Sequence, residues 1–405
     1  MKPELLSPVQ DLVSLKAAID AGADSIYFGI KELNMRMGAK NFEMNDVRKV
    51  IGICHGNDVK AYFTLNTIIY DDEHIKVRKI LERLKKEKID GVICWDFSVI
   101  KECEKLGLPI HISTQANVSN LETIMFLRDK IKNLKRINLA RELSLEQIKK
   151  IIKTIKNKKI DVEIETFVHG AMCVSVSGRC FLSQDVFGRS ANRGECLQPC
   201  RRKYLIKDIE EEHEFEIGED YVLSPNDLCT IDIIDRLIRS GIDCFKIEGR
   251  NRSPEYVKIV TECYRDAIDY CSEHKDYSKL KSLLKKKIKT VYNRGFSTGF
   301  YLGKPMDSWT DVYGTKATKK KVYLGKVLNY YKKPSVAEIK LETADLRLGD
   351  MIMFQGNNTG VVEQKVASIE VEKAKIDMGK KGRIVGVKTE KIVRKNDKVF
   401  LIRSS

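Results

Sequence analysis

The chain has 405 residues, of which 42% are hydrophobic and 32% charged, and its formal net charge is +16. This length allows one large domain and a smaller one, because a β/α barrel alone takes about 250 residues. No apolar run approaches the roughly 20 residues of a membrane span, and Pro3 and Glu4 stand where a signal peptide has its apolar core. We therefore expect a cytoplasmic protein without membrane contact. The basic excess suits an anionic partner such as nucleic acid, or simply solvated lysine-rich helix faces.

Short β-rich runs alternate with amphipathic helical segments through the first three quarters of the chain, which predicts parallel β/α units. Eight such runs predict a TIM-like β/α barrel, with an open doubly wound sheet as the alternative. Helix starts are expected at Asn45, at Ser144 with Gln147, and at Ser253 with Pro254. The expected strands are residues 4–6, 25–29, 60–66, 91–95, 110–114, 136–140, 162–168 and 243–248.

The domain boundaries are predicted where this alternation of β-rich and helical segments breaks. We expect a catalytic barrel domain at 1–303, with a cysteine-rich insertion at 170–225 in the unusually long connection before the last strand. From 321 to 405 the helical period gives way to alternating runs, which predicts a small C-terminal antiparallel β-barrel domain after a linker at 304–320. LRLGDMIMF and VRKNDKVFL in that domain share a turn pattern that indicates related hairpins.

Four of the eleven cysteines cluster in the insertion. Cys173, Cys180, Cys196 and Cys200 have the spacing C-x6-C-x15-C-x3-C, whereas the other seven lie singly on apolar segments as in a core. In a reducing compartment such clustering favours metal ligation over disulfides. Thiolates suit both zinc and an iron–sulfur cluster, and the spacing does not choose between them.

Polar residues follow the expected strands at their carboxyl ends, which form the active face of a β/α barrel. His169 directly precedes the insertion, so the metal is expected to overlook the barrel mouth, and its imidazole is a candidate general acid or base. The arginines could hold a carboxylate or phosphate, or could form structural ion pairs with neighbouring glutamates. The residues at the strand ends are Asn66, Asp96, Gln115, Asn117, Arg141, Glu142, His169, Glu248 and Arg250.

Several hydrolase and nucleotide-binding motifs are absent from the sequence. There is no H-E-x-x-H, G-x-G-x-x-G or P-loop, and GFSTG at 295–299 lacks the strand that a nucleophile elbow requires. Arg201, Arg202 and Lys203 follow the last clustered cysteine and could guide RNA phosphates or balance the charge of a thiolate cluster.

At these residues the chain resembles the collagenase-like peptidases of unassigned mechanism, peptidase family U32, which include oxygen-independent RNA hydroxylation proteins. The resemblance runs from ELLSP through NMRMGAKNF, ISTQANVSN, FVHGAMCVSVSGRC and CRRKY to FKIEGRNRSPEYV. It is strongest to the tRNA hydroxylation protein P branch. One departure is Val9 and Gln10, where the family usually has a small Ala-Gly pair.

The resemblance implies 5-hydroxylation of the tRNA wobble uridine, with prephenate, a small dicarboxylate, as the oxygen-donating co-substrate. The four cysteines are then ligands of an iron–sulfur cluster, most simply 4Fe-4S. Ribosomal RNA hydroxylation, a collagenase-like peptidase and a non-catalytic RNA-binding protein with structural zinc remain alternatives. We assign catalytic roles to His169, Glu248 and Arg250, and substrate-binding roles to Arg36, Asn66, Gln115, Asn117, Arg141 and Lys246.

Overall fold

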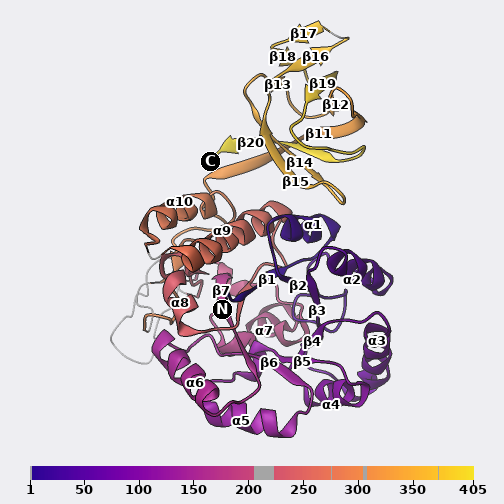
Figure 1. The fold of residues 1–405 in the computed structure, drawn as a ribbon. Helices are drawn as coiled ribbons and strands as arrows, with labels where there is room; N and C mark the ends of the chain where they lie inside the picture. Colours follow the sequence, from indigo (N-terminus) through magenta and orange to yellow (C-terminus); the bar gives the residue numbers. More distant parts are fainter. Residues whose placement is uncertain (1, 205–222, 275, 304–307, 373) are drawn as a thin grey trace.

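The computed structural model describes residues 2–204, 223–274, 276–303, 308–372 and 374–405. A ring of helices surrounds a central barrel, and a second, all-β domain stands against one side of that ring (Figure 1). Within these residues no helix is both long and apolar enough to cross a membrane.

Eight parallel strands form the barrel. Each pairs with its neighbour in chain order from β1 to β7, and β9 pairs with both β7 and β1, which closes the sheet. This closure confirms the predicted TIM-like barrel and excludes the open-sheet alternative. The strands are β1 Glu4–Pro8, β2 Ser25–Phe28, β3 Lys60–Thr64, β4 Gly91–Cys94, β5 Ile110–Ile112, β6 Leu134–Asn138, β7 Glu163–Gly170 and β9 Cys244–Ile247.

The outer helices present apolar stripes to the barrel. In α6 the buried residues recur at three- and four-residue spacing from Leu145 to Ile155, and Ser144 with Gln147 forms the expected capping box. The expected start at Asn45 is wrong, because a 3-10 turn covers Met44–Asp46 and α2 begins at Val47. The helices are α1 Leu12–Asp20, α2 Val47–His55, α3 His74–Lys86, α4 Phe97–Leu106, α5 Leu121–Lys130, α6 Leu145–Asn157, α8 Ile234–Ser240, α9 Pro254–Glu273 and α10 Ser278–Ile288.

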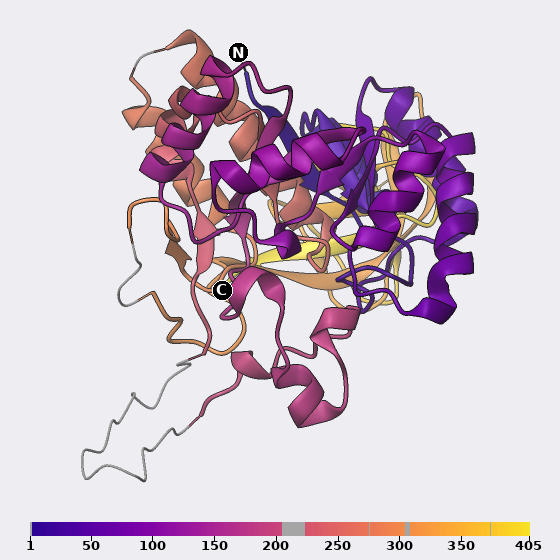
Figure 2. The ribbon, with the colours of Figure 1, turned by 90° about the horizontal axis from the view of Figure 1, so that it is seen from below.

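The cysteine-rich insertion interrupts the connection between β7 and β9 and projects from one end of the barrel (Figure 2). It contains α7 (Leu182–Phe187) and returns through β8 (Asp227–Cys229), which pairs antiparallel with the end of β7. Residues 205–222 of the predicted insertion lie outside the described residues. The short strand β10 (Phe296–Ser297) extends this edge beside β8.

The second domain is an antiparallel sheet with its own core. Its strand order is β15-β14-β20-β11-β12-β19-β16-β17, and β13 pairs separately with β18. Of the predicted linker, 304–307 lie outside the described residues, and β11 begins at Lys319. The strands are β11 Lys319–Tyr331, β12 Val336–Leu341, β13 Leu346–Arg347, β14 Met351–Gly356, β15 Gly360–Lys365, β16 Ile369–Val371, β17 Ala374–Ile376, β18 Met378–Gly379, β19 Ile384–Lys388 and β20 Lys398–Ser404.

The two similar sequence segments of this domain form equivalent turns. In one, Asp350 Oδ2 accepts a hydrogen bond from the backbone N–H of Arg347 at 2.8 Å; in the other, Asp397 Oδ2 accepts one from Arg394 at 2.7 Å. A residue with positive φ precedes each aspartate, Gly349 or Asn396. The shared pattern therefore does correspond to a shared local structure.

The second domain docks on α1 and α9. Ala17 of α1 packs with Met353 and Val361 in a small apolar cluster, and Lys321 forms an ion pair of 2.9 Å with Glu255 at the start of α9. An apolar contact beside an ion pair sets how the two domains meet.

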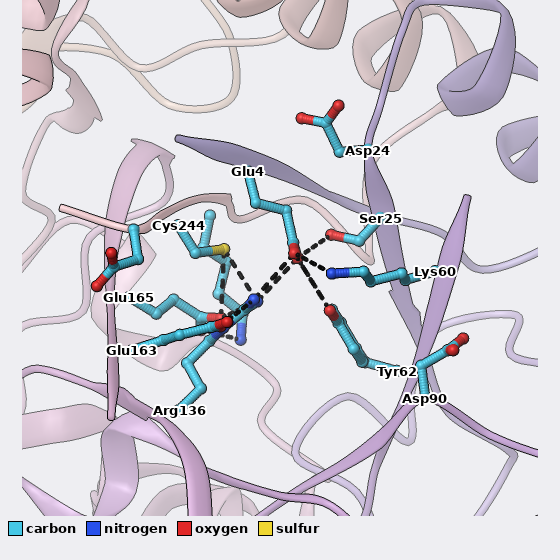
Figure 3. A network of polar contacts seen from close by, with 12 residues as sticks. Glu4, Asp24, Ser25, Lys60, Tyr62, Asp90, Arg136, Glu163, Glu165 and Cys244 are labelled. Carbon is cyan, nitrogen blue, oxygen red and sulfur yellow. Dashed lines mark hydrogen bonds and ion pairs between the residues drawn. The ribbon is translucent and has the colours of Figure 1, made fainter. Parts of the chain in front are cut away.

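The amino end of the barrel is closed by a buried network of charges (Figure 3). Arg136, only 2% exposed, donates two hydrogen bonds of 2.9 Å to the carboxylate of Glu4 and one of 2.7 Å to Glu163. Ser25 and Tyr62 also donate to Glu4, at 2.7 and 3.1 Å. Because every charge in this layer has partners, the desolvation cost of burying it is largely offset.

We expect Arg136→Ala to lower the free energy of unfolding by about 3–5 kcal/mol, because it leaves buried carboxylates without their cation. The exposed Arg78, paired only with Glu82 on α3, provides the control. Arg78→Ala should cost less than about 1 kcal/mol. Urea unfolding followed by circular dichroism measures both, and equal losses would contradict the role assigned to the network.

The same network predicts a pH dependence. Burial raises the pKa of Glu4, but the hydrogen bonds and charge of Arg136 outweigh it and lower that pKa from 4.5 to about 2. The stabilisation is therefore present above pH 4.5 and is lost as the pH falls toward 2.

Wild type should exceed Glu4→Gln in unfolding free energy by roughly 3 kcal/mol at pH 6, and this difference should shrink toward zero near pH 2. Denaturant unfolding across this range is the measurement, with Glu82→Gln on the surface as control. A difference that did not change with pH would show that Glu4 is not ionised by its contact with Arg136.

Candidate functional site

A cavity of about 170 Å³ opens at the carboxyl ends of the barrel strands and beneath the cysteine insertion. Its lining comes from the segments after β2, β3, β5, β6, β7 and β9, which are far apart in the sequence. Most of the residues predicted for the site line this one cavity: Arg36, Asn66, Gln115, Arg141, Lys246, Glu248, Arg250, Cys173, Cys180, Cys196 and Cys200. His169 and Asn117 do not.

Glu248 and Arg36 form an ion pair on one wall of the cavity. Two guanidinium nitrogens of Arg36 lie 3.1 and 3.2 Å from Glu248 Oε1. Burial raises the pKa of Glu248, but the charges of Arg36, Arg141 and Arg250 outweigh burial and hold the pKa below its ordinary value. Glu248 is therefore an anion that orients Arg36, not a proton donor.

Arg250 and Arg141 are cations in the same wall without a carboxylate in direct contact among the described residues. Arg250 donates to the neutral oxygens of Thr64 and Asn34, and burial lowers its pKa to about 10. Arg141 donates to the carbonyl of Ala171 at 2.9 Å and lies 3.8 Å from the centroid of the Phe167 ring, and burial lowers its pKa as well. Two such guanidinium groups favour an incoming anion, since it would supply the missing countercharge.

Lys246 lies on the floor of the cavity and is only 4% exposed. Its Nζ binds Glu165 Oε1 at 2.7 Å and lies 4.7 Å from the ring centroid of Tyr27. Glu165 also accepts from Asn138 at 2.6 Å and approaches Arg136 at 3.6 Å. The floor is thus connected through paired charges to the network at the other end of the barrel.

Two amide side chains, those of Asn66 and Gln115, also line the cavity. Asn66 accepts from the backbone N–H of Met35 at 3.2 Å and donates to Ser113 at 3.3 Å, so its hydrogen bonds join three strand-end segments. Gln115 accepts from Ser113 through Oε1, and its amide nitrogen has no hydrogen bond within the described residues. That nitrogen is available to a bound molecule.

All eleven cysteines are free thiols, and the four from the insertion line the cavity. Burial raises the pKa of Cys196 and Cys200, the neighbouring thiols raise it further, and Arg36 and Arg201 act in the opposite direction. Within the described residues no three Cys, His, Asp or Glu side chains converge as a single-ion site. A tetrahedral zinc site needs all its sulfurs about 2.3 Å from one ion, whereas a cubane cluster is held by thiolates on separate iron corners. Four thiols are the right kind and number of ligands for either group.

The prediction that His169 faces the mouth is wrong. Its side chain is 1% exposed, its Nδ1 lies 3.3 Å from the hydroxyl of Tyr264, and its ring packs against Tyr256 and Phe296. Burial lowers its pKa to about 3, so the imidazole is neutral. The inward position on β7 is taken by Phe167, and His169 instead packs behind β7 against α9.

Asn117 and Arg201 both shape the insertion, and Arg201 also lines the cavity and donates to the carbonyl of Met172 near the start of the insertion. Asn117, at a positive φ of 51°, accepts a hydrogen bond of 2.7 Å from Ser177 in the S-G-R-C segment. Arg201 donates to Ser224 at 2.8 Å and to the carbonyl of Pro225 at 3.1 Å, which ties the two ends of the insertion together. Sequence reasoning missed Tyr27, Thr64 and Ser113, which line the cavity but are ordinary strand residues by pattern.

Comparison with known proteins places the chain in a family. The model described as peptidase family U32 matches residues 10–311, which include the barrel and the insertion. The chain belongs to peptidase family U32.

Relatives of this U32 protein carry two kinds of name. An uncharacterized protease of Methanocaldococcus jannaschii is 45% identical over 99% of this chain and 98% of its own length. A collagenase of Porphyromonas gingivalis is 40% identical over 98% of this chain and 97% of its own. The tRNA hydroxylation protein P1 of Bacillus subtilis is 33% identical over 88% of this chain and 84% of its own. These names indicate an enzyme and leave open which reaction it catalyses.

Proposed function

We propose that this U32 protein is an iron–sulfur-dependent RNA hydroxylase that converts the wobble uridine of tRNA to 5-hydroxyuridine, with prephenate as the oxygen donor. The observation that carries this proposal is the convergence of four free thiols with Arg36, Arg141 and Arg250 on one cavity at the barrel mouth. Thiolates would hold the cluster, and the arginines would hold a small dianion beside it.

Cys173, Cys180, Cys196 and Cys200 are the residues that would bind the cluster, which would supply a site for redox activation of the donor. The guanidinium of Arg36 favours the thiolate form of Cys196, and that of Arg201 favours the thiolate form of Cys200. Arg201 would thus balance negative charge, one of the two roles predicted for it and for Arg202 and Lys203.

The arginine wall would bind the carboxylates of the donor. In the described part of the chain Arg141 and Arg250 have no directly bound carboxylate, while Glu248 keeps Arg36 oriented, so a dianion would complete the charge balance. The uridine would lose its C5 hydrogen and gain a hydroxyl, a two-electron oxidation. The donor would leave with one oxygen fewer and two more electrons, so the reaction needs no molecular oxygen.

The target base would enter from the open side of the cavity after leaving its stack. Exposed apolar side chains of the insertion include Val174, which lines the cavity, and Phe181, the neighbour in sequence of the lining residue Leu182, and a base could pack on them. Gln115 offers an amide N–H to a base edge.

A peptidase is the second candidate, because two relatives carry protease or collagenase names. In the described part of the chain no histidine lines the cavity, and its carboxylates are Glu142 and the arginine-paired Glu248. Ser297 of GFSTG only accepts a bond from the backbone of Gly299. Neither a nucleophile–base pair nor a carboxylate dyad is therefore assembled there.

The cluster is tested on anaerobically purified protein by its visible spectrum and by iron, sulfide and zinc analysis. Cys173→Ala should lose the brown absorption together with iron and sulfide. Cys271→Ala, a half-buried thiol on α9 outside the cavity, should keep them. Zinc without visible absorption, or equal metal in both variants, would remove the cluster from the proposal and favour a structural metal.

The activity is tested by incubating the holoprotein with prephenate and a tRNA transcript that has uridine at the first anticodon position, followed by nucleoside mass spectrometry. We expect 5-hydroxyuridine under anaerobic conditions. Arg141→Gln should weaken prephenate binding about 10- to 100-fold by calorimetry, because a charged hydrogen-bond donor is lost. Arg78→Gln is the matched control. Hydroxylation of ribosomal RNA but not of tRNA would assign ribosomal RNA as the substrate. Gelatin cleavage without any change in the nucleosides would support the peptidase.

A further inference from the structure

A second, larger hollow of about 1110 Å³ lies between the barrel and the C-terminal domain. The barrel contributes the segments after β1, β2 and β9 together with the start of α9, and the C-terminal domain contributes the β14–β15 turn and the residues leading into β20. We call it the interdomain groove. Neither domain could form it alone.

The groove is strongly basic. Its lining contains two carboxylates, Asp11 and the buried Asp397, against six cations. The cations are Lys40, Arg252, Lys321, Arg394, Lys395 and Lys398.

Most of these cations form no ion pair with another described residue. Lys40 pairs with Asp11 at 3.1 Å and Lys321 with Glu255 at 2.9 Å. Lys395 and Lys398 are exposed and have no side-chain hydrogen bond or ion pair within the described residues. The guanidinium of Arg394 contacts the neutral oxygens of Asn358 and Thr359, at 3.1 and 3.5 Å.

Backbone groups add to the positive potential. Ser253 and Pro254, the first residues of the 20-residue helix α9, line the groove, and Ser253 makes no side-chain cap bond. The N-terminal end of a helix carries partial positive charge and unpaired N–H groups, which favour anions. Arg252 lies just before this end and stacks 3.8 Å from the ring centroid of Tyr292 without an ion pair in the described chain.

The groove adjoins the candidate active site. Gly38 and Asn251 line both the groove and the mouth cavity. Gln10, the departure noted in the first loop, donates to the carbonyl of Arg252 at 2.7 Å and accepts from the N–H of Lys40 at 3.3 Å. It therefore joins the three barrel segments that form this shared wall.

The geometry points to the interdomain groove as the binding site for the phosphodiester backbone of the RNA whose target base enters the mouth. This inference rests on the proposed function for its choice of RNA among polyanions. A cluster of exposed cations without ion pairs in the described chain suits a chain of phosphates, since each contact releases a condensed counterion. The shared wall lets one strand occupy the groove while its neighbouring nucleotide reaches the cavity.

The test combines Arg394→Gln, Lys395→Gln and Lys398→Gln in one holoprotein. The matched control is Lys79→Gln, Lys85→Gln and Lys86→Gln on the outer face of α3, three exposed lysines without ion pairs in the described chain. The probe is a fluorescent tRNA transcript with uridine at the first anticodon position, and anisotropy gives its Kd between about 0.05 and 0.2 M salt.

We expect the groove variant to bind tRNA about 10- to 100-fold more weakly at 0.1 M salt, with the slope of log K against log salt reduced by about 2 to 3. Its visible spectrum, unfolding midpoint and prephenate affinity should match wild type, and the α3 variant should bind tRNA normally. An unchanged Kd and slope, an equal loss in the α3 variant, or no tRNA binding by wild type would overturn the inference. Equally tight, groove-dependent binding of polyglutamate would assign the groove to an acidic polypeptide instead.

Failure of the groove and failure of the proposed function give different results. Groove-dependent tRNA binding without any hydroxylation keeps the groove and rejects the hydroxylase. Hydroxylation by the groove variant with unchanged KM for tRNA keeps the hydroxylase and rejects the groove.

Discussion

The burial of charge inside a closed barrel is the constraint on which the rest of this structure depends. Four charged side chains occupy inward positions of β1, β6, β7 and β9, although few barrel cores hold charges. They are Glu4, Arg136, Glu165 and Lys246. An unpaired charge there would cost several kcal/mol, so each must meet its partner when the strands close. The ion pairs therefore couple the register of strands that are distant in the sequence (Figure 3).

The two ends of the barrel balance charge differently. At the amino end each acid has a cation or donor, and the network is complete without a ligand. At the mouth Glu248 pairs with Arg36, whereas Arg141 and Arg250 contact only neutral acceptors among the residues that the structure describes. A complete network stabilises the fold, and the arginines without a carboxylate partner in the described chain are the basis of the anion binding that we propose. This division agrees with the general rule that barrel chemistry occurs at the carboxyl ends of the strands.

The insertion and the C-terminal domain both extend the mouth outward. The insertion brings four thiols and exposed apolar side chains over the cavity, and the second domain adds one wall of a basic groove beside it. The docking contacts of Ala17 and Glu255 hold that wall in place. A small barrel pocket thereby becomes part of a surface large enough for a macromolecule.

The sequence by itself determined the eight strands, the amphipathic helices, the antiparallel second domain and the cysteine cluster, because local periodicity and spacing encode all of these. The rule that active-site residues follow the barrel strands also predicted most of the residues that line the cavity, including Arg141, Glu248 and the four cysteines. It failed at His169, because the inward or outward direction of a side chain at the end of β7 depends on how β8 and α9 pack there. The predicted helix start at Asn45 was wrong for a local reason, because a 3-10 turn precedes α2.

Only the tertiary structure decided which charges are paired. By sequence, Arg36, Arg141 and Arg250 are three similar cations. They differ in the fold because Glu248, more than a hundred residues away in the chain, pairs with Arg36, whereas no described carboxylate contacts Arg141 or Arg250. The interdomain groove is likewise invisible in either domain's sequence, since its cations come from opposite sides of a docking contact. Electrostatic energy depends on distance in space, and only the folded chain sets that distance.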